Sequence, residues 1–246
     1  MAAVTRAPAP GRPITYPESD GQPTAENTKQ FRWIVTVEGG LEALFRNDPD
    51  VFVAGDLLWY PVEGRPDTCT APDALVVFGR PKGDRGAYLQ WREGDIAPQV
   101  VFEILSPGNT VAEMTRKFRF YERHGVEEYY LYDPDDGELS GWRRRGGEFE
   151  EIEQMVGWVS PRTGVRFGLE AGELQLFRPD GERFATYLEL MAQQEQARQR
   201  AAEEHRRAEQ EAQRAEQERE RAEQAAQRAE RLAAQLRALG VEPLNS

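Results

Sequence analysis

Residues 98–107 read PQVVFEILSP, and this segment decides how the middle of the chain folds. Side chains alternate between the two faces of a strand, and here both faces are apolar apart from Glu103. Such a pattern is typical of a strand buried on both sides. Burying a carboxylate in that setting costs roughly a few kcal/mol of lost hydration, and this cost is offset only if a cation pairs with it. The sequence therefore predicts a buried strand with one paired acid, whose partner is either a divalent metal or a basic side chain.

Helical and extended patterns alternate on both sides of this strand. The first expected helix begins near Thr24 or Ala25 and has an apolar stripe of Phe31, Ile34, Leu41 and Phe45. The expected helices cover 24–46 and 110–124, and the expected strands cover 51–60, 74–78, 98–105, 128–132, 139–145, 149–155, 165–169 and 174–177. This order predicts an α/β fold with a mixed sheet flanked by helices.

The composition divides the 246-residue chain into four parts. Residues 1–23 are expected to be a flexible leader, 24–190 a folded domain, 191–239 a long helix rich in Ala, Glu, Gln and Arg, and 240–246 a tail. In the helical part, alanines recur at alternating steps of four and three, but His205 and Arg219 fall on the same seam. The pattern leaves open a coiled coil and a single exposed helix.

Charge and cysteine content narrow the possible classes of protein. The net charge is −12, but the stretch from 193 to 239 holds ten Glu and ten Arg, so the excess lies elsewhere. Bulk charge of this sign does not attract nucleic acid, which argues against a protein that coats DNA. A single cysteine allows no internal disulfide and suits the cytoplasm. No apolar stretch approaches the ~20 residues that span a bilayer, so no membrane association is expected.

Two further residues are candidates for a site around Glu103. Asp73 opens the apolar strand 74–78, and if that strand neighbours the one at 98–105, the two carboxylates meet on one face. Paired carboxylates beside a backbone carbonyl suit Mg²⁺. Lys117 borders the apolar stripe of the helix 110–124 and could reach back to the acids. Taken alone, Asp73 is an ordinary acid at a strand end and Lys117 an ordinary solvated lysine.

These residues carry a resemblance to a known family. Pro72-Asp73, the segment 98–107, the run from Lys117 to Tyr121 and the segment 124–134 (HGVEEYYLYDP) together resemble the Uma-type restriction endonucleases, a branch of the PD-(D/E)XK phosphodiesterase superfamily. The resemblance covers about residues 25–187. The Glu-Ile-Leu-Ser-Pro element followed by a helix and Gly-Val-Glu-Glu-Tyr is its most specific part.

The resemblance implies a Mg²⁺ site, with Mn²⁺ as a substitute, held by Asp73, Glu103 and the Ile104 carbonyl. The superfamily pattern places a lysine two residues after the glutamate, where this chain has Leu105, so Lys117 is the expected replacement. An acid from the first helix often completes such sites. Here that acid is expected to be Glu26, with Glu38 as the rival.

The expected function is Mg²⁺-dependent cleavage of nucleic acid, most simply DNA, with the choice between DNA and RNA left open. The alternative is a catalytically inactive nuclease fold that acts as an interaction protein through its helical tail. A homodimer through either the domain or the tail fits both functions. An arginine capping Glu103 would favour the interaction protein, whereas Lys117 beside paired carboxylates would favour the enzyme.

Overall fold

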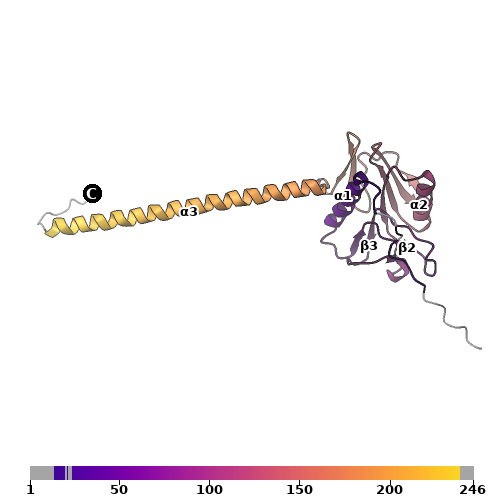
Figure 1. Ribbon diagram of the computed structural model, residues 1–246, viewed down its shortest axis with the longest axis horizontal. Helices are drawn as coiled ribbons and strands as arrows, with labels where there is room; N and C mark the ends of the chain where they lie inside the picture. The colour runs from indigo at the N-terminus through magenta and orange to yellow at the C-terminus, as the bar shows by residue number, and fades with distance from the viewer. Residues whose placement is uncertain (1–13, 20, 22–23, 239–246) are drawn as a thin grey trace, which may run out of the picture. The chain divides into compact units, whose positions relative to one another are not determined.

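The computed structural model describes residues 14–19, 21 and 24–238. Most of the expected leader, 1–23, and the whole expected tail, 240–246, lie outside the described residues. By its internal contacts the chain divides into two compact units, Met1–Tyr187 and Leu188–Ser246. The first unit contains the β-sheets and the two α-helices α1 and α2, and the described part of the second is one long helix (Figure 1).

A six-stranded mixed sheet is the centre of the first unit. Its strand order is β1-β3-β5-β6-β7-β8, and only β5 and β6 run parallel. The strands of this sheet are β1 Val51–Ala54, β3 Ala74–Phe78, β5 Val100–Ile104, β6 Glu128–Asp133, β7 Glu138–Arg145 and β8 Glu148–Glu151. The expectation of an α/β fold with a mixed sheet is confirmed.

Helices cover the two faces of this sheet. α2 (Val111–Arg123) connects the parallel strands β5 and β6, as a parallel pair requires. Its Thr110 cap and the left-handed Gly125 just beyond it, with φ 94°, are where the sequence predicts them. α1 (Thr28–Leu44) lies on the other side of the sheet (Figure 1). β5 is buried along its whole length between these layers, as the apolar pattern of both its faces predicts.

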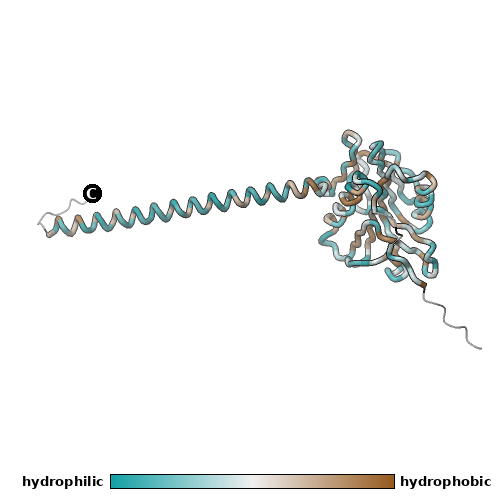
Figure 2. The backbone as a smooth tube through the Cα atoms, viewed as in Figure 1, coloured by the Kyte–Doolittle hydropathy of each residue, from teal (hydrophilic) through white to brown (hydrophobic). Residues whose placement is uncertain are grey.

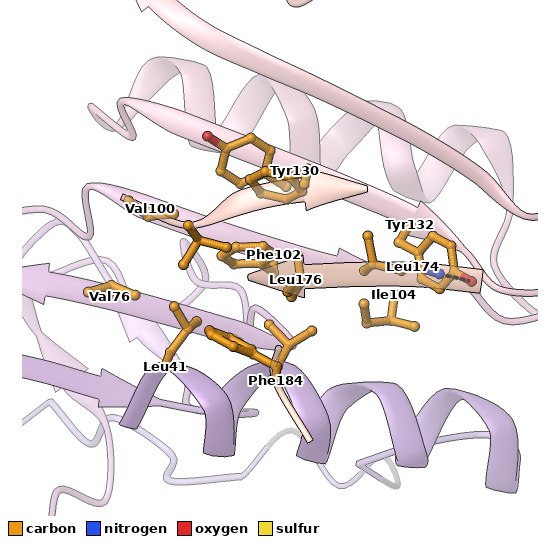
Figure 3. Packing of buried hydrophobic residues seen from close by; sticks show 14 of the residues in the cluster. Leu41, Val76, Val100, Phe102, Ile104, Tyr130, Tyr132, Leu174, Leu176 and Phe184 are labelled. Carbon is orange, nitrogen blue, oxygen red and sulfur yellow. Dashed lines mark hydrogen bonds between the residues drawn. The ribbon is translucent and has the colours of Figure 1, made fainter. Parts of the chain in front are cut away.

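The face of the sheet toward α1 carries the larger hydrophobic core. Figure 3 shows Phe102 and Ile104 of β5 packed with Leu174 and Leu176 of a small second sheet, formed by β9 (Arg166–Glu170) and β10 (Glu173–Phe177). Phe184 closes this core against α1. A Cβ atom on Gly40 would lie only 2.0 Å from the Phe184 ring, so the glycine in the middle of the helix makes room for this packing.

Three expected elements differ from the structure. The strand expected over 149–155 ends at Glu151, as β8. The strand expected over 51–60 is two strands, β1 and β2 (Trp59–Tyr60), because Asp56 between them has a left-handed backbone with φ 49°. β2 pairs with β4 (Tyr88–Leu89), which precedes the short 3₁₀ helix η1 (Gln90–Arg92).

α1 begins at Thr28, capped by Asn27, not at Thr24 or Ala25. Its buried residues also differ from the expected stripe. Phe31 is 52% exposed, whereas Gln30, Trp33 and Val37 are buried. The helix is therefore rotated so that a polar residue, Gln30, faces the interior.

The second unit is the helix α3 (Tyr187–Ala238). None of its described residues is buried, and Figure 2, which colours the backbone by residue hydropathy, shows that most residues of the helix are hydrophilic. No helix within residues 24–238 combines the length and apolar character needed to cross a membrane.

Candidate active site

Asp73 and Glu103 face each other across two neighbouring strands. β3 pairs antiparallel with β5, with Ala74 opposite Phe102. The same register carried one residue further sets Asp73 opposite Glu103, and opposite residues of an antiparallel pair share one face of the sheet. Thirty residues of chain separate the two acids, so only the strand pairing brings them together.

Both oxygens of Glu103 accept a hydrogen bond from α2. The Lys117 ammonium lies 2.8 Å from Oε2, and the hydroxyl of Tyr121 donates to Oε1. Lys117 and Tyr121 are four residues apart, so they project from one face of the helix. Glu103 is 3% exposed. The basic partner of this buried acid is therefore Lys117 and not an arginine.

Lys117 is held as a cation. Burial alone would lower its pKa, but the charges of Glu103 and Asp73 outweigh burial and hold the pKa above its ordinary value. Its ammonium also lies 3.5 Å from the carbonyl oxygen of Ala71. Lys117 can stabilise negative charge at this place, and its protonated state makes it unsuited to act as a base.

Asp73 has a carboxyl group that resists ionisation. Its Oδ2 accepts a hydrogen bond of 2.6 Å from the Ile104 amide. Burial, followed by the neighbouring charge of Glu103, raises its pKa well above the ordinary value, although Lys117 and the Ile104 amide act in the opposite direction. If both carboxyl groups were ionised, the one ammonium group, which pairs with Glu103 at 2.8 Å, would leave a negative charge unneutralised, and for this reason Asp73 resists ionisation in the metal-free site.

The raised pKa of Asp73 predicts how metal-free stability depends on pH. The folded chain binds a proton at Asp73 more tightly than the unfolded chain does. The stabilisation is therefore complete below the unfolded pKa and is lost as the pH rises through the folded pKa, by up to about 1.4 kcal/mol per pH unit. Urea unfolding in EDTA, repeated at pH values between the unfolded and the folded pKa of Asp73, should show that the free energy of unfolding of the parent falls as the pH rises. The free energy of unfolding of Asp73→Asn should fall less. If it fell equally steeply with pH in both proteins, the prediction would be wrong.

A cavity of about 460 Å³ opens beside these residues. Asp73 and Lys117 line it. Glu103 is not among the lining residues, and its two carboxylate oxygens accept hydrogen bonds from Lys117 and Tyr121. Besides Asp73, three acidic side chains line the cavity, namely Glu26, Asp56 and Glu113. The cavity is therefore acidic and suits a cation before it suits a bare phosphate.

Glu26 comes to this cavity from the segment that precedes α1. Its Oε2 accepts a hydrogen bond of 2.5 Å from the Ser106 hydroxyl in the turn after β5. A Cβ atom on Gly108 would lie 2.0 Å from the same oxygen, so the glycine of the Ser-Pro-Gly turn leaves room for Glu26. The rival acid, Glu38, lies in the middle of α1, against Gly55. Burial and then the charge of Glu42 raise its pKa.

The sequence reasoning missed two residues of the cavity. Gln30 donates from Nε2 to the Ile104 carbonyl at 2.9 Å, and its Oε1 accepts from the Glu26 amide at 2.9 Å. Its spacing of four and seven residues from Ile34 and Val37 places it on the buried face of α1, which was an available signal. Asp56 also lines the cavity, and its charge contributes to the raised pKa of Asp73. The Gly-Asp pair that interrupts the apolar run 51–60 was the signal for that residue.

The donor atoms fit a hard divalent cation held by few protein ligands. Asp73, Glu103 and the Ile104 carbonyl offer only oxygen, and a carboxylate has about four acceptor positions, so those of Glu103 are not exhausted. Mg²⁺ is commonly bound by one or two carboxylates and several waters. Within the described part of the chain, no three His, Cys, Asp or Glu side chains form a ready-made metal site. The set offers two carboxylates and one carbonyl, so an ion held here would need water for its remaining ligands.

Known proteins resemble this chain in sequence and in structure. The family described as "Uma2: Putative restriction endonuclease" matches residues 20–176. Among solved structures, the chain is similar to that of "a putative nuclease belonging to DUF820 from Anabaena variabilis ATCC 29413", with 20% identity and a TM-score of 0.42 over 55% of this chain and 72% of that chain. No curated protein sequence matches.

Proposed function

Because the family match spans more than half of the sequence, the chain belongs to the Uma2 family of putative restriction endonucleases, and we propose that it is a Mg²⁺-dependent endonuclease that hydrolyses DNA. The observation that carries this proposal is the group of Asp73, Glu103 and Lys117. A buried acid needs one cation for stability. Here two acids lie beside one lysine at a cavity, so a divalent cation that displaces the proton of Asp73 would supply the second positive charge where a substrate can reach.

In this proposal Asp73 and Glu103 hold the metal, and the Ile104 carbonyl is a further ligand. When bound, Mg²⁺ or Mn²⁺ supplies a water of lowered pKa and neutralises charge on the scissile phosphate. The Ile104 amide, which donates to Asp73, fixes the orientation of that carboxylate. Gln30 holds the Ile104 carbonyl from the other side.

Lys117 supplies the fixed positive charge of the site. Its ammonium lies at the boundary between Glu103 and the cavity, where it can contact a phosphate oxygen as negative charge accumulates in the transition state. Glu26 lines the same cavity, where Ser106 donates to its carboxylate, and there it would bind a water. Its role as a fourth catalytic residue is part of the proposal.

Cleavage assays on the purified full chain test this function. Supercoiled plasmid, single-stranded DNA and RNA are incubated with Mg²⁺, with Mn²⁺ and with EDTA. We expect cleavage of DNA with either metal and none with EDTA. Asp73→Asn should lower the rate by at least about 100-fold, because altering even an outer partner of a metal ligand costs ~10- to 100-fold.

Asp67→Asn is the matched control. Asp67 lies six residues before Asp73 on the surface and pairs with Arg65 at 3.0 Å, so the same chemical change there should leave the rate unaltered. Cleavage that persists in EDTA would contradict the proposal. So would an Asp73→Asn protein as active as the parent, or a parent that cuts no substrate under any of these conditions.

A further inference from the structure

The charges of α3 are sorted by position around the helix. The repeating alanines define a heptad, in which Ala208, Ala215, Ala222 and Ala229 occupy position d. Positions e and g flank the seam formed by a and d. Within residues 204–230 these flanks contain glutamate at seven of eight positions, Glu204, Glu209, Glu211, Glu216, Glu218, Glu223 and Glu230. Four arginines form a column at position c, which lies next to g and farther from the seam, so that Arg207 and Arg214 precede Glu211 and Glu218 by four residues; the column consists of Arg207, Arg214, Arg221 and Arg228.

The large apolar side chains of α3 follow the same sorting. Leu188, Leu190 and Met191 fall at e, g and a near the start of the helix, and Leu232 and Leu236 fall at g and d near its end. All five are exposed. Positions b, c and f of α3 carry no large apolar residue anywhere between 187 and 238. One face of the helix, made of positions a, d, e and g, thus combines an alanine seam, acidic flanks and apolar ends. We call it the acidic face.

A second copy of the chain does not complement the acidic face. In a parallel pair, position g meets position e of the following heptad, which sets Glu211 against the partner's Glu216. The seam then also sets Arg219 against its own copy. In an antiparallel pair, e meets e and g meets g, which again opposes glutamates. Like charges at these positions disfavour pairing, so the expected homodimer through the helix is not supported.

We propose that the acidic face binds a helix of a different protein, one that carries Lys or Arg at its own flanking positions. Lys or Arg at positions e and g of the partner helix pairs with the glutamates at positions e and g of α3, and the opposite charges guide the partner to this face. Alanine leaves space on the seam, which larger apolar residues of the partner can fill. The partner is thus a basic amphipathic helix. This proposal is independent of the nuclease activity, because it concerns a surface outside the domain that carries the candidate active site.

The test uses a synthetic peptide as the probe, with the sequence of residues 201–236, its seven flanking glutamates replaced by lysine and its residues at positions a and d replaced by leucine. A second peptide has the same leucines and keeps the glutamates. Binding of each to the full chain is measured by fluorescence anisotropy, and the mass of the free chain by light scattering. We expect the lysine peptide to bind with a 1:1 stoichiometry that weakens with salt, the glutamate peptide not to bind, and the free chain to be monomeric.

Charge reversal on the full chain identifies the face. The triple variant Glu209→Lys, Glu216→Lys and Glu223→Lys should bind the lysine peptide about tenfold more weakly or worse, and should gain binding to the glutamate peptide. The matched control is the triple variant Gln210→Lys, Gln217→Lys and Gln224→Lys, which adds positive charge at position f, behind the seam. It should bind almost as the parent does. Circular dichroism checks that both variants stay helical.

Three results would overturn this proposal. One is a parent chain that dimerises through α3. Another is equal weakening by the flank variant and the position-f variant, which would indicate binding by bulk charge alone. The third is a lysine peptide that does not bind.

Discussion

Replacing Glu103 with glutamine is expected to lower metal-dependent cleavage by at least about 100-fold and to weaken the binding of Mg²⁺ and Mn²⁺. Glutamine preserves the shape of the side chain and removes its charge. Glu103 is the more deeply buried acid of the pair, 3% exposed against 9% for Asp73, so a surface carboxylate cannot replace it as a ligand. Cleavage rate and metal affinity, the latter by titration calorimetry with Mn²⁺, are measured on the same preparation.

Glu113→Gln is the matched control for Glu103→Gln. Glu113 lies on α2 and lines the same cavity, but its carboxylate is near Asn109, which donates to it at 3.4 Å, and it has no assigned role. Its substitution should change the rate by less than about twofold, within the few tenths of a kcal/mol typical of such surface changes. If Glu103→Gln kept the activity of the parent, the assignment of the metal site would be wrong.

Replacing Lys117 with methionine is expected to have opposite effects on catalysis and on metal binding. Loss of one group that stabilises transition-state charge lowers the rate by about 10²- to 10³-fold. The Lys117 ammonium group, however, competes with a metal ion for the carboxylates of Asp73 and Glu103. Without it, Mn²⁺ should bind more tightly. A purely structural salt bridge would not produce this opposition.

The same substitution should destabilise the metal-free protein. Methionine fills the space of the lysine stem but leaves the charge of Glu103 unpaired, which costs about 3 kcal/mol or more for a buried pair. Urea unfolding in EDTA should show this loss, and Mg²⁺ should restore much of it by taking the place of the ammonium group.

Lys82→Met provides the comparison for this loss of stability. Lys82 pairs with Glu42 at 3.0 Å in a partly exposed position, so its loss should cost under about 1 kcal/mol and should not respond to Mg²⁺. If Lys117→Met were equally destabilised with EDTA and with Mg²⁺, a metal held by Asp73 and Glu103 would be ruled out.

The arginines near the candidate site differ in whether an acidic side chain already pairs with them. Arg80 and Arg85 both pair with Glu93, at 3.0 and 2.8 Å. Arg116 and Arg119 lie exposed on α2, the helix that also carries Lys117. Contacts to a nucleic-acid backbone are therefore better sought on α2 than near Glu93.

Local sequence determined those features that depend on neighbouring residues. The double-sided apolar pattern of 98–107 predicted a buried strand with one costly acid, and β5 is such a strand. The caps of α2 follow from Thr110 and Gly125, which act within one turn of the helix. The sorting of glutamate and arginine around α3 is also written in the sequence, because a regular heptad fixes it without any tertiary contact.

Only the tertiary structure decided which groups surround Glu103. Asp73 reaches it through the register of β3 against β5, and Glu26 and Gln30 arrive from a segment more than seventy residues away in the chain. The backbone of Asp56 breaks an apparently continuous strand and turns its carboxylate toward the same cavity. These positions arise from packing between segments that are distant in the chain. The free energy of that packing depends on the whole fold, so no local pattern of residues predicts these positions.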